Sequence, residues 1–467
     1  MTQASTGGVV TGPVTGGDRG WPFAASMLDI KALGYEEHEY FLSGDATRYR
    51  QVDGTQWGRD GRWQVEPAGT AAYKTRILVY RPADARRFNG TVIVTWNNVT
   101  AGYEMFGADS LEIIEGGYAL VCASVQRVGI EGLPPVRQGL AAWDPGRYGT
   151  LSIPGDDYSF DIFTQIGRAV GPERNRAGCD PLAGLAVQRV VAQGASQSAG
   201  RLATYVNAIA PLASAFDGFV LCIYFGRGTP VEVGDTVVNI NAPAQNAPGD
   251  SLRGTNLLRD DLNKPIFIVN SELEAIACHG VRQPDSDTLR WWESAGTCHV
   301  SQQSRAARQR MADRDGLVTR SGDDSINAIP FGPLYDAAYH HMHCWLQDGA
   351  LPPIQPRVEF AGSPPQVVRD ADGIARGGIR LPQVEVPLAQ NSAIPLANDI
   401  FSYLGGSSRP FGREVVRARY VTREAFLGRF EAAARAAVAA GVLRPREVQR
   451  LGAEAVATWP GGVRAND

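Results

Sequence analysis

The residues with the clearest chemical potential lie in the stretch VVAQGASQSAGR, at 190–201. An apolar run leads into SQSAG at 196–200, and a helical segment follows. A strand, a sharp turn and a helix in this order form a nucleophile elbow, which exposes its central residue between small neighbours. With Ser196 in front and Gly200 behind, the pattern predicts Ser198 as the nucleophile. The alternative is an ordinary turn between small residues.

A serine nucleophile needs a base, and the base needs a carboxylate that orients it. Glu272 and Glu274 follow an apolar strand predicted at 265–270, and His299 comes later, after a second strand and a Gly-Thr loop. Alternate residues at an extended strand end point the same way, so both glutamates are candidates for the acid. Glu274 is favoured by its distance from the start of the strand, and His299 is the predicted base.

The histidines at 340, 341 and 343 form a second group, in a segment that predicts a helix ending at Gly349. His340 and His343 share one helical face with Cys344 nearby, so a metal site is one interpretation. The favoured interpretation is packing of the helix under the segment 350–400, since no further ligands are spaced to complete a site. We therefore expect no metal and no cofactor.

Acyl transfer also needs hydrogen-bond donors for the developing oxyanion. The backbone N–H of Ala199, directly after the predicted nucleophile, is one expected donor. The second donor is expected from the loop after the strand TVIVTW at 91–96, where Asn98 is the candidate. The alternative for Asn98 is a plain turn residue.

The surrounding elements are those that such a site requires. Short apolar runs alternate with helical stretches, which predicts a mostly parallel sheet covered on both faces; the runs lie at 91–96, 119–125, 187–192, 218–224 and 265–270. We expect a flexible N-terminus at 1–20, a β-rich extension at 21–85 and an α/β core at 86–349. The region 350–467 is expected to wrap the core and end in a helical hairpin, with Thr422 as an N-cap. An insertion at 226–262 is interpreted either as packing or as an active-site lid.

Composition excludes several classes of protein. The chain has 467 residues and a formal net charge of −4, with 44% hydrophobic residues, which argues against a disordered chain. The near-neutral charge without a basic block argues against nucleic acid or an anionic membrane as partner. We see no membrane-spanning run and no signal peptide. The 6 scattered cysteines are expected to be free thiols, and a cytoplasmic location follows.

Several longer stretches in order resemble a bacterial α/β-hydrolase-domain family of carboxylic-ester hydrolases with a Ser-Gln-Ser-x-Gly elbow. They run through nearly the whole chain: TVIVTWNNVTAG, YGTLSIPGDDYSFDIF, WESAGTCH, WLQDGALPP, GGIRLPQVEVPLA and the C-terminal hairpin. The resemblance implies an α/β-hydrolase fold, esterase or lactonase activity, and a triad of Ser198, Glu274 and His299. In the family Gly usually follows the serine directly, whereas here Ala199 intervenes.

We therefore expect a serine hydrolase that cleaves a small carboxylic ester or lactone through an acyl-enzyme. Aromatic residues near the site loops suggest an apolar or aromatic substrate, namely Trp96, Tyr103, Phe106, Tyr158, Trp291 and Trp292. Two alternatives stay open. One is an acyltransferase or cyclase on the same fold, in which a hydroxyl or amine replaces water. The other, less favoured, is a binding protein without catalysis.

Overall fold

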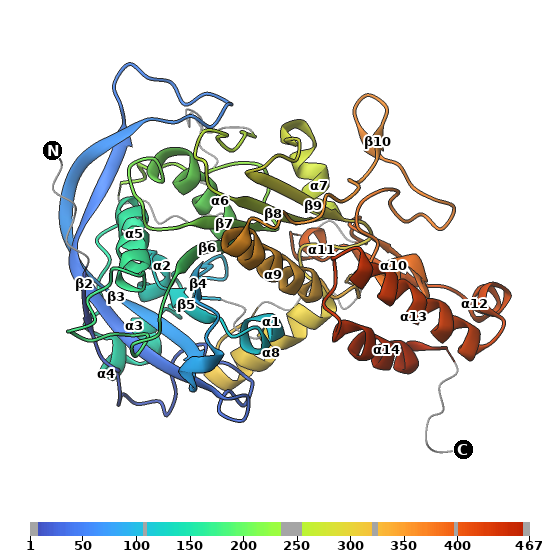
Figure 1. Ribbon diagram of the computed structural model, residues 1–467, viewed down its shortest axis with the longest axis horizontal. Helices are drawn as coiled ribbons and strands as arrows, with labels where there is room; N and C mark the ends of the chain where they lie inside the picture. Colours follow the sequence, from blue (N-terminus) through green and yellow to red (C-terminus); the bar gives the residue numbers. More distant parts are fainter. Residues whose placement is uncertain (1–7, 106–109, 235–254, 320–325, 397–399, 461–467) are drawn as a thin grey trace.

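A nine-stranded sheet in the order β1-β2-β3-β5-β4-β6-β7-β8-β9 forms the centre of the molecule (Figure 1). The computed structural model describes residues 8–105, 110–234, 255–319, 326–396 and 400–460. Most of the insertion interpreted as a lid, residues 235–254, lies outside these described residues.

Six neighbouring strands of the sheet run parallel, as the apolar runs predict. They are β4 (Thr91–Trp96), β5 (Ala119–Ala123), β6 (Arg189–Ala195), β7 (Gly218–Cys222), β8 (Ile266–Ser271) and β9 (Leu289–Ser294). Their side chains are almost all buried on both faces, which is why most of these strands are apolar runs without alternation. In β9 the buried Arg290 and Glu293 interrupt the run and form ion pairs with Asp285 and Arg282. The carboxyl ends of these strands meet at one edge, where open α/β sheets bind their ligands.

The N-terminal region continues the same sheet in antiparallel fashion. It contributes β1 (Val9–Thr11), β2 (Tyr35–Gln51) and β3 (Val65–Pro82), and β3 pairs with β5. Within residues 8–20, for which the sequence predicts flexibility, β1 pairs with β2 and the following loop bonds the core. The backbone N–H groups of Asp18 and Arg19 donate to the carboxylate of Asp144, 3.1 and 3.0 Å away.

Helices cover both faces of the sheet, and strand alternation determines which side chains meet them. Val92 and Val94 join one apolar cluster together with Phe163 of α5 (Ser159–Ala169). Ile93 joins the other cluster, which contains Leu334 of α9 (Gly332–Asp348). The first face also holds α6 (Gln197–Thr204) with its π-helical continuation η3 (Tyr205–Ile209), and the second holds α1 (Leu111–Glu115). The expected α/β architecture is thereby confirmed.

The remaining helices of the core are α2 (Arg127–Glu131), α3 (Leu140–Trp143), α4 (Pro145–Tyr148), α7 (Glu272–Cys278) and α8 (Gln302–Asp315), with 3-10 turns η1 (Ala85–Arg87), η2 (Asp156–Tyr158) and η5 (His279–Val281). Among the described residues, no helix is both long enough and apolar enough to cross a lipid bilayer.

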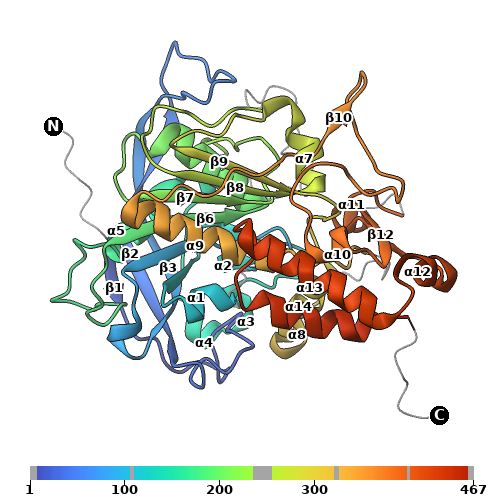
Figure 2. The same cartoon turned by 45° about the vertical axis from the view of Figure 1, so that its right-hand side comes forward.

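The C-terminal region packs at the opposite end of the molecule from β2 (Figures 1 and 2). It contains β10 (Phe360–Ala361), β11 (Gln366–Val367), α10 (Pro382–Glu385), β12 (Ala389–Ser392), α11 (Ile400–Gly405), β13 (Ser407–Pro410), α12 (Arg413–Tyr420), α13 (Arg423–Ala439) and α14 (Glu447–Thr458). The side chain of Thr422 caps α13 by accepting from the N–H of Ala425 at 3.1 Å, as its sequence position predicts. Helices α13 and α14 pack against each other, and Phe426, Phe430 and Leu451 bury their apolar side in the second cluster.

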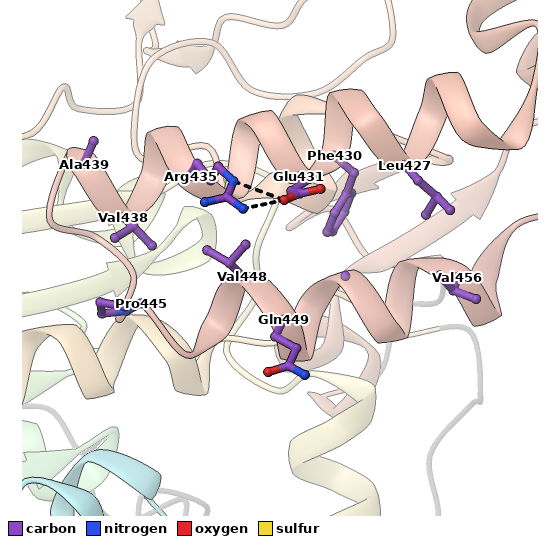
Figure 3. A pocket seen from close by; sticks show the side chains of 11 residues that line it. Leu427, Phe430, Glu431, Arg435, Val438, Ala439, Pro445, Val448, Gln449 and Val456 are labelled. Carbon is purple, nitrogen blue, oxygen red and sulfur yellow. Dashed lines mark hydrogen bonds and ion pairs between the residues drawn. The ribbon is translucent and has the colours of Figure 1, made fainter.

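A cavity of about 780 Å³ lies between α13 and α14 (Figure 3). Its lining is mainly apolar, and an ion pair between Glu431 and Arg435 lies beside it. None of the residues predicted to do chemistry contributes to this lining.

Candidate active site

The turn between β6 and α6 has the backbone geometry of a nucleophile elbow, with Ser196 at its apex. Ser196 has φ 62° and ψ −119°, a strained conformation that non-glycine residues rarely adopt. Gly194 lies two residues earlier, where a Cβ would come within 2.5 Å of the carbonyl oxygen of Ser198. Only glycine allows the strand and the helix to pass this closely, so the elbow comprises residues 194–198.

The prediction that Ser198 is the central residue of the elbow is therefore wrong. Ser198 is the second residue of α6 and is fully buried. Its Oγ has no hydrogen-bond partner among the described residues, and it occupies the position of the small residue behind the apex. The sequence does indicate the correct register: Gly194, Ser196 and Ser198 form the motif G-x-S-x-S, with Ser196 at its centre.

The strand ends hold Ser196 in place while leaving its hydroxyl available. Its backbone N–H donates to the carbonyl oxygen of Cys222 at the end of β7, 3.0 Å away, and its carbonyl accepts from the N–H of Gly200 at 3.1 Å. The residue is partly exposed, and no residue in the described ranges bonds its Oγ. A serine hydroxyl held in this way can meet a ligand.

Glu274 is a buried carboxylate held rigidly at the start of α7. Ser271 caps the helix, and both its N–H and its hydroxyl donate to Oε2 of Glu274, at 3.2 and 2.5 Å. The other oxygen, Oε1, lies 2.7 Å from Nδ1 of His299. The structure thus brings together the favoured acid and the predicted base.

Glu272, the alternative acid, turns away from the imidazole. Its Oε1 pairs with the guanidinium of Arg369 at 2.7 Å, and its Oε2 accepts from the N–H of Gly296 at 2.8 Å. Because Gly296 belongs to the loop that carries His299, Glu272 fixes that loop to the C-terminal region.

His299 lies in the loop after β9 with its side chain largely buried. The ring of Phe225 stacks on its imidazole, with centroids 5.2 Å apart and planes inclined by 28°. Since Nδ1 faces Glu274, the other ring nitrogen, Nε2, is the one left for a reacting group. No hydrogen-bond partner for Nε2 occurs among the residues that the structure describes.

The two expected oxyanion donors are not placed as the sequence predicts. With the apex at Ser196, the residue directly after it is Gln197, and Ala199 lies further along α6. The backbone N–H of Asn98 donates to the carbonyl oxygen of Met105, and its Nδ2 to that of Ala195, both at 3.0 Å. Asn98 therefore links the loop after β4 to the elbow, and both of these donors are already bonded within the protein.

A family model described as an alpha/beta hydrolase domain matches residues 10–453. The chain belongs to this family. Its fold and the resemblance inferred from its motifs are thereby confirmed. A comparison with curated proteins gives no match.

Solved structures similar to this α/β-hydrolase include three esterases. Brefeldin A esterase, a bacterial homologue of human hormone-sensitive lipase, is 14% identical over 59% of this chain and 76% of its own, with a TM-score of 0.27. A bacterial heroin esterase is 15% identical over 63% and 87%, with a TM-score of 0.29. The esterase Est22 is 13% identical over 62% and 82%, with a TM-score of 0.28.

The aromatic residues expected near the site mostly belong to the core of the α/β-hydrolase. Trp96, Trp291 and Trp292 are at most 1% exposed and pack between helices and sheet. Phe106 lies outside the described residues. Because these three tryptophans are buried in the core, they do not support the expectation of an apolar or aromatic substrate.

The histidines of α9 bind three different parts of the hydrolase. His340 lies 3.6 Å from Glu112, His341 contacts the carbonyl oxygen of Gly441 at 2.7 Å, and His343 contacts the hydroxyl of Thr91 at 2.8 Å. Within the described ranges, no group of three or more His, Cys, Asp or Glu side chains is placed to hold a metal ion. All 6 cysteines are free.

Proposed function

We propose that the protein is a serine hydrolase that cleaves a carboxylic ester or lactone, with Ser196 as nucleophile, His299 as base and Glu274 as acid. One observation carries the proposal: a strained serine turn lies on the same sheet edge as a buried Glu–His pair. β6, β7, β8 and β9 are consecutive parallel neighbours, so the loops that carry these residues share that edge.

The reaction begins when Nε2 of His299 takes the proton of the Ser196 hydroxyl and Oγ attacks the acyl carbon. Glu274 keeps the other ring proton on Nδ1 and stabilises the imidazolium that forms. The tetrahedral intermediate expels the alcohol, which takes a proton from His299. Water, deprotonated by the same imidazole, then attacks the acyl-enzyme and releases the carboxylic acid.

The developing oxyanion would be bound by the backbone N–H of Gln197 and by an amide of the loop after β4. This loop is fixed against the elbow, since the N–H of Val99 donates to Oε1 of Gln197 at 3.3 Å and Asn98 bonds Ala195. Preorganised backbone donors of this kind stabilise the transition state without reorganising during the reaction. We assign Asn98 a positioning role in this arrangement.

Hydrolysis of 4-nitrophenyl esters with short and medium acyl chains tests the proposal. Ser196→Ala is expected to lower kcat by about 10⁴- to 10⁶-fold, as removal of a triad serine does in other hydrolases. Ser198→Ala is the matched control, two residues away in the same turn, and is expected to retain turnover within about tenfold of the wild type. Full activity of Ser196→Ala would overturn the proposal.

A further inference from the structure

Arg308 lies on the inward face of α8, the helix that follows His299, yet it contacts solvent. Residues at spacings of three, four and seven share one face of a helix, which places Arg308 with Met311, Ala312 and Asp315. Met311 packs against the first apolar cluster, and Ala312 and Asp315 are buried. Arg308 alone of these four is exposed. An inward-facing cation that still meets solvent can be reached by a ligand.

The surroundings of Arg308 connect it to the candidate active site. Its positive charge acts on the phenols of Tyr103, in the loop after β4, and Tyr335, in the first turn of α9. Burial raises the pKa of Tyr335, and the negative charge of Glu274 raises it further, whereas Arg308 lowers it. Tyr335 therefore lies within electrostatic reach of both Arg308 and the carboxylate that holds His299.

The guanidinium of Arg308 lacks the partner that such a cation usually has. Although its side chain meets solvent, the protein atoms around the guanidinium desolvate it and lower its pKa, and the nearby phenols of Tyr335 and Tyr103 do not offset this effect. Among the described residues, no carboxylate pairs with Arg308 and no residue bonds it. Arg314, on the same helix, shows the usual arrangement, since it pairs with Asp315 at 2.8 Å. A guanidinium that faces inward, is partly desolvated and has no carboxylate partner is suited to bind an anionic ligand.

We propose that Arg308, assisted by the hydroxyl of Tyr335, binds a carboxylate carried by the substrate. The substrate of the proposed esterase is then an acidic ester, with a carboxylate group apart from the ester that is cleaved. A guanidinium suits this role because its planar fork donates two parallel hydrogen bonds to a carboxylate. This inference rests on the proposed function, and it names the substrate class of that same site.

Two pairs of matched esters test the proposal. Mono-4-nitrophenyl adipate is compared with 4-nitrophenyl hexanoate, and 4-acetoxybenzoate with its methyl ester, so that the carboxylate lies first on the acyl side and then on the alcohol side. The wild type is expected to prefer the acidic member of at least one pair. Arg308→Met is expected to lower kcat/KM for that member by about 10- to 100-fold and to leave the neutral member within about threefold.

Three variants make the result specific. Arg308→Lys keeps the charge without the fork and should fall between the wild type and Arg308→Met, and Tyr335→Phe should cost less than Arg308→Met. Arg310→Met is the matched control, because Arg310 lies on the outward face of α8 and is exposed. Circular dichroism and Tm verify that each variant folds. The proposal is wrong if the wild type prefers neither acidic ester, or if Arg308→Met lowers both members of a pair equally.

Ser196→Ala, assayed in parallel, separates this inference from the proposed function. If Ser196→Ala abolishes hydrolysis while the wild type ignores the carboxylate, only the anion site fails. If Ser196→Ala stays active, the proposed function fails. A readout without turnover is the binding of 4-acetamidobenzoate, an amide analogue. Tighter binding than of its methyl ester, lost in Arg308→Met, supports the proposal, and equal binding overturns it.

Discussion

Two regions of the molecule bury charged side chains, and they differ in what is left unpaired. Under the N-terminal strands, Arg76 is fully buried and each of its guanidinium nitrogens has a partner. Nε bonds Glu39 at 2.5 Å, Nη1 bonds Glu104 at 3.1 Å, and Nη2 bonds the carbonyl oxygen of Phe23 at 2.6 Å. Arg147 binds the second oxygen of Glu39 at 2.6 Å. We call these four charged residues the Arg76 cluster.

At the carboxyl edge of the sheet, by contrast, the hydrogen bonding of the candidate site residues is incomplete. Glu274 is held by Ser271 and His299, but within the described residues nothing bonds Nε2 of His299 or Oγ of Ser196. In the Arg76 cluster every guanidinium nitrogen of Arg76 is bonded within the protein, and the unpaired Oε1 of Glu104 is buried, so the cluster contributes to stability and offers no atom to a substrate. Polar side-chain atoms without partners, next to strained backbone, are typical of active sites.

The largest contrast is expected from His299→Gln. We expect kcat on 4-nitrophenyl esters to fall by about 10⁴- to 10⁶-fold, because the variant lacks the proposed base. The unfolding free energy should fall by only about 1–3 kcal/mol, because Gln replaces only in part the bond from Nδ1 to the buried carboxylate of Glu274. Steady-state kinetics and urea unfolding measure the two effects. A variant that keeps its activity but unfolds readily would place His299 with the structural residues.

Glu274→Gln should come next, with kcat reduced by about 10³- to 10⁴-fold because the imidazole loses its orienting anion. Glu272→Gln is the matched control, two residues away in the same turn of α7. It weakens the contact with Arg369, so its unfolding free energy should fall by about 1–3 kcal/mol while folded molecules keep activity within about tenfold. If Glu272→Gln lost activity and Glu274→Gln kept it, Glu272 would be the acid and the assignment of Glu274 would be wrong.

Arg76→Met is expected to act on stability, costing about 3–5 kcal/mol of unfolding free energy by leaving buried carboxylates without their cation. Burial raises the pKa of Glu104 above its ordinary value of 4.5, and Arg76 opposes that rise. Without Arg76 the folded state should therefore bind a proton more readily than the unfolded state. Stability then falls as pH rises above about 4.5, so the deficit is expected to be larger at pH 8 than at pH 5. Urea unfolding at both values tests this, and a deficit independent of pH would contradict it.

The smallest effect is expected from Phe225→Leu, which removes the ring stacked on His299. An aromatic contact of this kind contributes about 0.5–1.5 kcal/mol, which corresponds to about 2- to 12-fold in kcat/KM. The Tm should change little, since Phe225 is only partly buried. Unaltered kinetics would show that Glu274 alone orients the imidazole.

The sequence predicted the scaffold well because its central strands are continuous apolar runs with little ambiguity. It also predicted the Glu274–His299 contact, because each residue lies in the segment that follows one of two predicted strands. The register of the elbow was wrong because Ser196 and Ser198 both have small neighbours, and a single positive φ decides between them. Gly194 distinguishes the two registers, because only an apex at Ser196 places glycine where the strand and the helix pass closely.

Other features had no pattern to reveal them. Helix α8 reads QQSRAARQRMADRD and is polar almost throughout, so no periodicity marks Arg308 as inward-facing. Asn98 was a reasonable donor by position, but its bonds to Met105 and Ala195 depend on how two loops pack. The tryptophans could not be assigned to core or site before the sheet was known.

The identity of the nucleophile is tested most directly by labelling with a fluorophosphonate. Trypsin should release the peptide 190–201, which follows Arg189, ends at Arg201 and contains both serines. Fragment ions then locate the adduct. We predict the label on Ser196, retained in Ser198→Ala and absent from Ser196→Ala. An adduct on Ser198 of the wild-type protein would contradict the account.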